Sequence, residues 1–214
     1  MKQSNEHKGK ASVPIPRIVA CIEDQPPIPT RVLALYKFVT PKIKREFLKE
    51  LQHILEAECR KYKARGTLLI AEEGINGTIC YPFEPDQKED HLLTFLQSTF
   101  DNGLRTRISR ADRLVFARLK IKIKSEIVTM HQEECSPTES KGLYVKPDEW
   151  NQLIQDPDCL VIDTRNEYEI HVGNFRNAVN PKTQSFVEFP DWMEQNIQGN
   201  QAPKKIAMFC KYNM

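Results

Sequence analysis

Cys210 is the residue of this chain with the strongest case for nucleophilic chemistry. It ends the segment Lys204–Cys210, KKIAMFC, whose apolar residues predict a buried strand. A cysteine attacks as the thiolate, and it does so near neutral pH only when its surroundings lower its pKa. We therefore treat Cys210, at the carboxyl end of a strand, as the candidate catalytic residue.

Asp163 is expected at the same edge of the same sheet. Leu160–Asp163 is a short apolar segment that ends in an acid, which is typical of a buried parallel strand. Ligands of such sheets bind at the carboxyl ends of the strands. Asp163 and Arg165 are therefore candidates for shaping a cleft beside Cys210. The alternative is that they pair with nearby charges and fix the loop.

The turn AEEGINGT, residues 71–78, is a second candidate site. Its backbone amides could meet an anion, with two acids beside them for proton transfer. The alternative is an ordinary hairpin turn in which Gly and Asn supply positive φ angles. The GK[ST] ending of a phosphate-binding loop is absent. The candidate ligand residues are Glu72, Glu73, Gly74, Asn76 and Gly77.

Eight basic residues and a single acidic one lie between Leu104 and Lys124. Along one face of a sheet, such side chains would follow an RNA backbone electrostatically. The alternative is a solvated sheet face without a partner. The predicted RNA-binding residues are Arg105, Arg107, Arg110, Arg113, Arg118, Lys120, Lys122 and Lys124.

Composition and cysteine usage narrow the class of protein. The chain has 214 residues, 40% hydrophobic and 28% charged, which is typical of a soluble globular protein. No apolar run approaches the ~18 residues of a membrane span, and the N-terminus lacks the apolar core of a secretory signal. We expect a cytoplasmic protein whose six cysteines are reduced. His131 and Cys135 are too few for a metal site, and no cofactor is evident.

Residues 31–130 are predicted to form one domain, preceded by a flexible, Pro-rich lead-in at 1–30. Thr40-Pro41 predicts the start of a helix that runs to about Tyr62. A capping box at Asp86–Glu89 predicts the start of a second helix, which Asn102-Gly103 ends. Strands are expected at 31–39, 66–71, 78–81, 105–109 and 114–128. The resulting order β-α-β-β-α-β is that of the ferredoxin-like split βαβ fold, an α+β arrangement.

A different pattern begins after a polar linker at residues 131–142. Short helices are expected at 147–154 and 190–197, and strands at 160–163, near 175–180 and at 206–210. Strands that alternate with helices predict a parallel sheet, so residues 143–214 form an α/β domain.

Three segments of this second domain resemble the first half of a rhodanese domain: LVIDTRNEYE at 160–169, GNFRNAVN at 173–180 and KIAMFC at 205–210. GTLLIAEEGINGT and FARLKIKIKSEIVT lie upstream. With them, the chain resembles the two-domain tRNA uridine-34 hydroxylase family over about residues 31–210. In that family an acylphosphatase-like domain with the ferredoxin fold precedes a rhodanese domain.

The resemblance implies oxygen-dependent hydroxylation of the wobble uridine of tRNA to 5-hydroxyuridine. tRNA is then the partner and molecular oxygen the oxidant. Cys210 matches the family's active-site cysteine, which in rhodaneses carries a persulfide. Two other functions stay open, namely a rhodanese-type sulfurtransferase and an inactive product with an RNA-binding domain.

The residues after Cys210 depart from the family. A rhodanese loop curls C-x-x-x-x-R around the sulfur, so that backbone N–H groups and a helix N-terminus point at it. The family's version reads Cys-Thr-Gly-Gly-Ile-Arg, whereas Lys211-Tyr-Asn-Met214 stands here. We therefore expect a C-terminally truncated member, inactive at this length, with an incomplete rhodanese domain and an exposed edge on the Cys210 strand.

Overall fold

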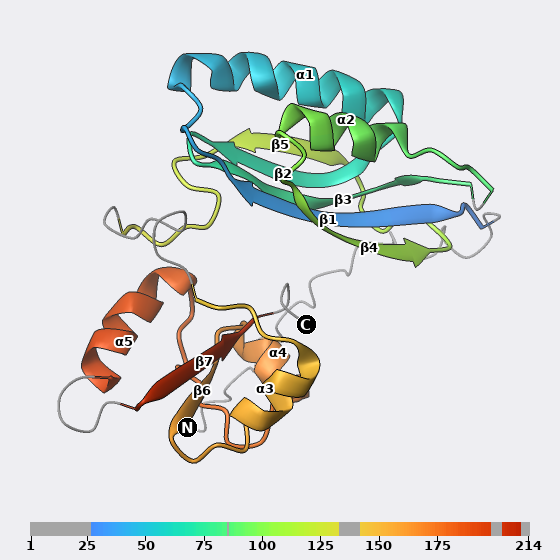
Figure 1. The fold of residues 1–214 in the computed structure, drawn as a ribbon. Helices are drawn as coiled ribbons and strands as arrows, with labels where there is room; N and C mark the ends of the chain where they lie inside the picture. The colour runs from blue at the N-terminus through green and yellow to red at the C-terminus, as the bar shows by residue number, and fades with distance from the viewer. Residues whose placement is uncertain (1–26, 85, 133–141, 198–202, 211–214) are drawn as a thin grey trace, which may run out of the picture.

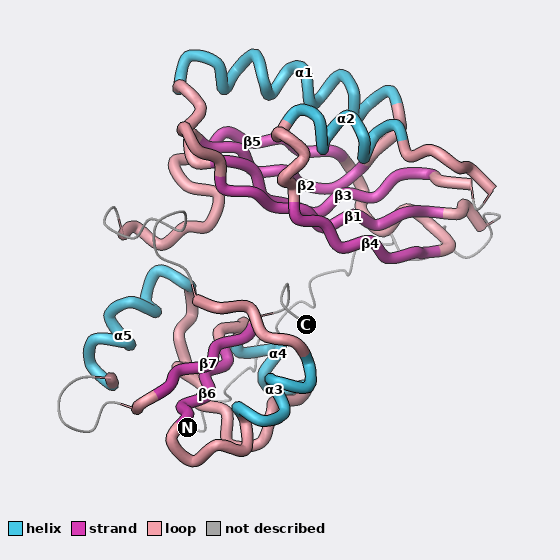
Figure 2. Tube along the Cα trace, viewed as in Figure 1, coloured by secondary structure: helices cyan, strands magenta, loops and turns pink. Residues whose placement is uncertain are grey.

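The computed structural model describes residues 27–84, 86–132, 142–197 and 203–210. These residues form a five-stranded sheet with two helices and, further along the chain, a two-stranded sheet with three helices (Figure 1, Figure 2). Most of the predicted lead-in, most of the predicted linker with Cys135, and the four residues after Cys210 lie outside the described residues.

The first sheet has the strand order β4-β1-β3-β2-β5. Neighbouring strands are antiparallel except β2 and β5, which are parallel. Helices α1 and α2 cover one face of this sheet (Figure 1). The ferredoxin-like prediction is confirmed, with β5 added at the β2 edge. The strands are β1 (Thr30–Phe38), β2 (Arg65–Ala71), β3 (Gly74–Pro82), β4 (Arg105–Ala111) and β5 (Leu119–Ile123); the helices are α1 (Leu48–Lys61) and α2 (His91–Thr99).

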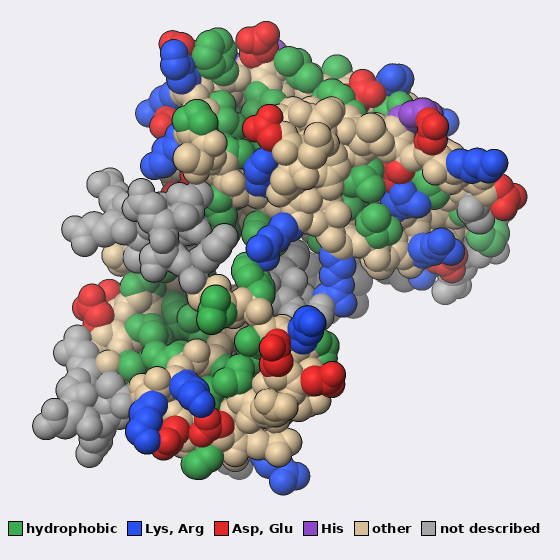
Figure 3. All heavy atoms as spheres, viewed as in Figure 1, with side chains coloured by type: hydrophobic (Ala, Val, Ile, Leu, Met, Phe, Trp, Pro, Cys, Tyr) green, Lys and Arg blue, Asp and Glu red, His purple; other side chains and the backbone are tan. Residues whose placement is uncertain are grey.

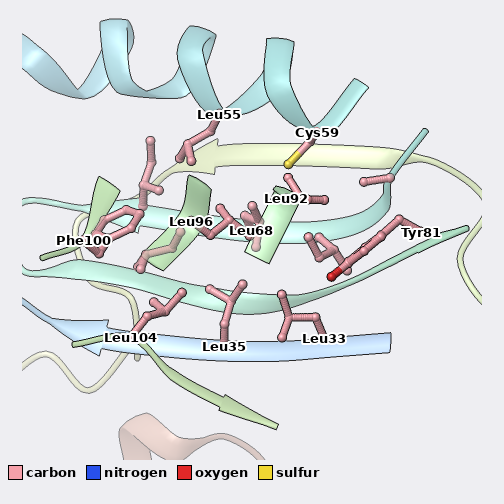
Figure 4. Close-up of a cluster of buried hydrophobic side chains, with 14 residues drawn as sticks. Leu33, Leu35, Leu55, Cys59, Leu68, Tyr81, Leu92, Leu96, Phe100 and Leu104 are labelled. Carbon is pink, nitrogen blue, oxygen red and sulfur yellow. The ribbon is translucent and has the colours of Figure 1, made fainter. Parts of the chain in front are cut away.

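The main core fills the space between this sheet and its two helices (Figure 4). Leu33 of β1, Leu68 of β2 and Leu55 of α1 are fully buried there. Each such side chain contributes roughly 1.5–3 kcal/mol by leaving water. The apolar stripes on both helices therefore hold the sheet, as their helical spacing predicts.

Both helices begin later than predicted. A short 3₁₀ helix at Arg45–Phe47 precedes α1, and the amides of Val39 and Ile43 donate to carbonyls of the β2–β3 turn instead of starting a helix. Asp90, not Asp86, caps α2, because its carboxylate accepts the backbone N–H of Leu93 at 3.0 Å.

The β2–β3 turn is also shorter than predicted. Strand β3 begins at Gly74, so only Glu72 and Glu73 lie between the two strands. Gly74, Asn76 and Gly77 stand within β3, which pairs with β1 on one side and β2 on the other. Hydrogen bonds to both neighbours satisfy the backbone groups of β3, so the strand includes residues that were expected to form the turn.

The strand predicted at 114–128 is also shorter in the structure, where only β5 forms.

The second sheet pairs β6 (Cys159–Asp163) with β7 (Lys205–Phe209) in parallel, as predicted. The segment near 175–180 contributes only one bridge, between Ile162 and Val179. A small core gathers Val161, Ala207 and Phe209 with Trp150 and Phe175. The helices are α3 (Pro147–Leu153), α4 (Glu167–Val172) and α5 (Phe189–Asn196), with a 3₁₀ turn at Phe186–Glu188.

Within the described ranges, no helix combines the length and the apolar character needed to cross a membrane.

Candidate functional site

Cys210 follows β7 directly and is half-buried. Its neighbour Phe209 pairs with Asp163, the last residue of β6. The backbone N–H and the hydroxyl of Thr164 both donate to the Phe209 carbonyl, at 3.0 and 2.9 Å. Cys210 and Asp163 therefore stand at the carboxyl ends of adjacent parallel strands, where α/β sheets bind their ligands.

Asp163 is completely buried and is held by Arg165. Arg165 Nε donates to the two carboxylate oxygens at 2.9 and 3.1 Å, and Nη2 donates to Oδ2 at 2.7 Å. These hydrogen bonds raise the pKa of the Arg165 guanidinium. Its Nη2 also donates to the Gly173 carbonyl at 2.7 Å. These contacts show that the pair stabilises the loop after β6, and they explain both residues without a bound ligand.

Beside the Cys210 edge, an apolar groove of about 560 Å³ runs along β7. Ile206 and Met208 of β7 are 40% and 49% exposed, and β7 pairs only with β6 among the described residues. Hydrophobic side chains gather on this side of the second unit (Figure 3). The buried indole N–H of Trp150 has no hydrogen-bond partner among the residues that the structure describes. Among the described residues, β7 therefore forms an edge of the two-stranded sheet.

The glycines of the predicted ligand loop have structural reasons. Gly74 has a φ of 144°, and a Cβ there would collide with the Lys37 carbonyl. A Cβ on Gly77 would collide with the Thr67 carbonyl. Both positions therefore need glycine because neighbouring strands approach closely.

The polar residues of the same loop hold the segment after β5. Glu73 Oε1 accepts the N–H of Ile127 at 2.6 Å, and Asn76 Nδ2 donates to the Ile127 carbonyl at 2.9 Å. Ile127 is 1% exposed as a result. The Glu72 carbonyl accepts the N–H of Ile43 at 2.7 Å. These contacts account for Glu73 and Asn76 without an anion.

The basic residues of the segment 105–124 separate according to strand register. Leu33 and Leu35 of β1 are buried under the helices, and side chains alternate along a strand, so Val32, Ala34 and Tyr36 face the opposite way. Directly paired residues share a face. We call the face opposite α1 and α2 the open face. It carries Arg105 and Arg107 of β4, Lys120 and Lys122 of β5, and Arg118 just before β5.

Two of the eight predicted residues lie elsewhere, and a third, Lys124, lies just beyond the end of its strand. Arg110 pairs with Arg31 and faces the helix side, because it is an odd number of residues from Arg107. Arg113 lies in the β4–β5 connection with its Nε 3.9 Å from the Asp112 carboxylate. Lys124 follows β5, and its backbone N–H donates to the Ile70 carbonyl. The expectation that all eight share one sheet face is therefore wrong.

Arg65 is a further cation of the open face that sequence reasoning left out of the site. It begins β2 and pairs with Cys80 of β3. The sequence places it beside the basic end of α1, which makes it resemble ordinary helix surface. Strand alternation counted back from the buried Leu68 is the signal that identifies its face.

One corner of the open face connects to the second unit through Tyr144. Its hydroxyl lies 3.0 Å from that of Tyr36, and the Arg105 guanidinium lies 4.2 Å from its ring centroid. Burial raises the pKa of Tyr36, and the hydrogen bond with Tyr144 adds to the shift. Tyr144 also lines the groove along β7 with Phe209. The open face is thus linked by direct contacts to the groove beside Cys210.

No group of three or more His, Cys, Asp or Glu side chains in a metal-binding arrangement occurs in the part of the chain that the structure describes.

Comparison with known proteins connects both units to one group. Residues 30–127 match the family described as UPF0176 acylphosphatase like domain. Three curated relatives are each described as a tRNA uridine(34) hydroxylase. The relative from Rhizobium leguminosarum bv. trifolii is 47% identical over 184 residues, that from Rhizobium etli 45% over 184, and that from Prochlorococcus marinus 43% over 185.

These alignments cover 84–85% of this chain but 56–57% of the relatives. The chain therefore spans a little more than half the length of the curated relatives that it matches.

Proposed function

We propose that this chain, which belongs to the tRNA uridine(34) hydroxylase family, contributes to the hydroxylation of uridine 34 of tRNA to 5-hydroxyuridine. The observation that carries the proposal is the 43–47% identity to relatives of that name over 84–85% of the chain. Because the chain spans little more than half of those relatives, the activity and the tRNA substrate are proposed for a protein of their length. We propose the cytoplasm as its compartment and molecular oxygen as its oxidant.

Within this function we assign the active-site thiol to Cys210, in a domain of the rhodanese type. Its half-buried position at the carboxyl end of β7 supports the assignment. Cys59 and Cys80 are completely buried in the first unit. Cys159 begins β6, at the opposite end of the parallel pair. A substrate base at the ligand-binding edge of the second sheet would therefore meet Cys210 and not Cys159.

The proposal is tested with a chimera in which residues 1–210 of this chain are followed by the part of the Rhizobium leguminosarum relative that lies beyond the matched region. The chimera is incubated with tRNA that lacks the modification, and nucleosides are measured by mass spectrometry. We expect 5-hydroxyuridine at position 34, and its loss in the Cys210→Ser variant. Cys159→Ser, in the same sheet, is the matched control and should retain activity.

Two results would contradict the proposal. If a folded chimera makes no 5-hydroxyuridine while the intact relative does, the proposed function is wrong. If the Cys210→Ser variant makes as much product as the unchanged chimera, only the role assigned to Cys210 is wrong. Repeating the reaction without oxygen, and with isotopically labelled oxygen gas, tests the oxidant, since the label should appear in the product.

A further inference from the structure

We propose that the open face of the first sheet holds a double-helical stem of RNA by both of its phosphate backbones, one along each edge of the sheet. The inference rests on the proposed tRNA substrate and names the surface and the part of the RNA that it fits. The surface is built by strands β4, β1, β3, β2 and β5 on the side away from α1 and α2 (Figure 1).

One ladder row crosses the whole sheet with a cation at each end. Arg107 pairs with Ala34, Ala34 with Thr78, Thr78 with Thr67, and Thr67 with Lys120. Four steps between neighbouring strands separate the two ends by about 19 Å. The three residues between the ends are small and uncharged. We call the two charged edges of the open face, on β4 and β5, its margins, and the small residues between them its floor.

Each margin continues along its strand. Arg118, Lys120 and Lys122 follow one another on the β5 side, with about 6.6 Å between successive alternate residues. Arg105 and Arg107 form the β4 margin. Among the strand residues on this face, no Asp or Glu occurs.

The floor is unsuited to unpaired bases. Proteins that hold single strands stack successive bases on aromatic side chains. The middle row of the open face instead carries Ala34, Thr78 and Thr67, and the next row carries Val32, the buried Cys80 and the cation Arg65. Tyr36 lies nearer one end, where its hydroxyl bonds to Tyr144 and accepts from Arg105 Nη1 at 3.2 Å.

Two separated lines of cations fit a ligand with two separated lines of phosphates. A single strand offers one line, whereas a duplex presents a backbone on each side of its shallow minor groove, and proteins recognise it there by shape and phosphate contacts. A stem on the open face would also lie beside the Tyr144 corner, which adjoins the groove along β7. This places the RNA next to the unit that carries Cys210.

The test measures binding of the purified 214-residue chain to three fluorescent RNAs at several salt concentrations. The RNAs are a hairpin with the anticodon stem and loop, a blunt duplex of the same stem, and an unpaired RNA of equal length. We expect the hairpin and the duplex to bind about tenfold tighter than the unpaired RNA, with strong salt dependence. Equal or tighter binding of the unpaired RNA would overturn the proposal.

Substitutions locate the two margins. The double variant Arg107→Gln/Lys120→Gln removes one cation from each margin, and it should bind the duplex about tenfold more weakly with a salt slope smaller by about 2. The matched control Arg110→Gln/Lys49→Gln removes one cation from the other face of β4 and one from α1, and it should bind as the unchanged chain does. Circular dichroism verifies the fold of both variants. Equal duplex affinity of the two variants would contradict the proposed surface.

The outcome is separable from that of the hydroxylation assay. If the chimera modifies tRNA but the margin variants bind normally, the activity stands and this surface is wrong. If the chain binds duplex RNA through both margins but the chimera modifies nothing, the surface stands as an RNA-binding face and the assigned reaction is wrong.

Discussion

The Arg165 guanidinium closes onto the Asp163 carboxylate from two residues away, with three nitrogen–oxygen distances between 2.7 and 3.1 Å. Asp163 is 0% exposed in its side chain and Arg165 12%. The same guanidinium lies 5.3 Å from the Phe209 ring centroid. The pair therefore fastens the loop after β6 against the end of β7, next to Cys210.

Replacing Arg165 by Met should destabilise the second unit by about 3 kcal/mol, because it leaves a buried carboxylate without its partner. Urea unfolding of the purified chain measures this loss. Arg176→Met changes an exposed arginine of the same unit and should stay within about 0.5 kcal/mol of the unchanged chain. Equal stability of the two variants would mean that the pair does not hold the loop.

Asp90 and Asp86 distinguish the observed start of α2 from the predicted one. Asp90 caps the helix, accepts a hydrogen bond from Tyr81 at 2.6 Å and pairs with Arg31. Asp90→Ala should therefore cost about 3 kcal/mol of unfolding free energy. Asp86 is exposed, so Asp86→Ala should cost little. A larger loss from Asp86→Ala in the same denaturation experiment would support the cap predicted from sequence.

Gly74 should not tolerate a side chain. Gly74→Ala forces a methyl group against the Lys37 carbonyl at a φ of 144°, and we expect a loss of about 2 kcal/mol or more. At Gly142 an added Cβ meets no atom of the described residues within 4 Å, so Gly142→Ala is the matched control. Thermal unfolding followed by circular dichroism compares the two. Tolerance of Gly74→Ala would show that the β1–β3 approach can relax.

Stability should fall in mild alkali because of Cys59. Burial raises the pKa of its thiol to about 12, with the carboxylates of Glu58 and Glu56 adding to the shift. The unfolded chain releases this proton near pH 8.5, while the folded chain keeps it. The unfolding free energy should therefore decrease above about pH 8.5, by at most about 1.4 kcal/mol per pH unit for this group.

Urea titrations between about pH 7.5 and pH 9 check the effect of Cys59, below the unfolded-state pKa of about 10 at which Tyr81, whose pKa burial also raises, contributes. Cys59→Ala should flatten the pH dependence. Leu55→Val, in the same core, should lower stability at every pH without changing the slope. An unchanged slope in Cys59→Ala would exclude this thiol as the cause.

Much of the fold was predictable because it depends on local periodicity. Apolar stripes identified α1 and α2, and short apolar runs identified β6 and β7. The first residues of both helices were not predictable from the sequence, because they depend on hydrogen bonds and ion pairs with distant residues. The amide of Val39 bonds to Glu73, and the carboxylate of Asp90 also meets Arg31.

The amino-acid sequence by itself determined the order of the elements, the resemblance to the family and the place of Cys210 at the end of an apolar strand. Only the tertiary structure decided which charges act together. Arg107 and Arg110 lie three residues apart, yet they face opposite sides of β4, whereas Arg107 and Lys120 share a row across five strands. The physical reason is that strand register sets the face of every side chain, and register follows from pairing between distant segments.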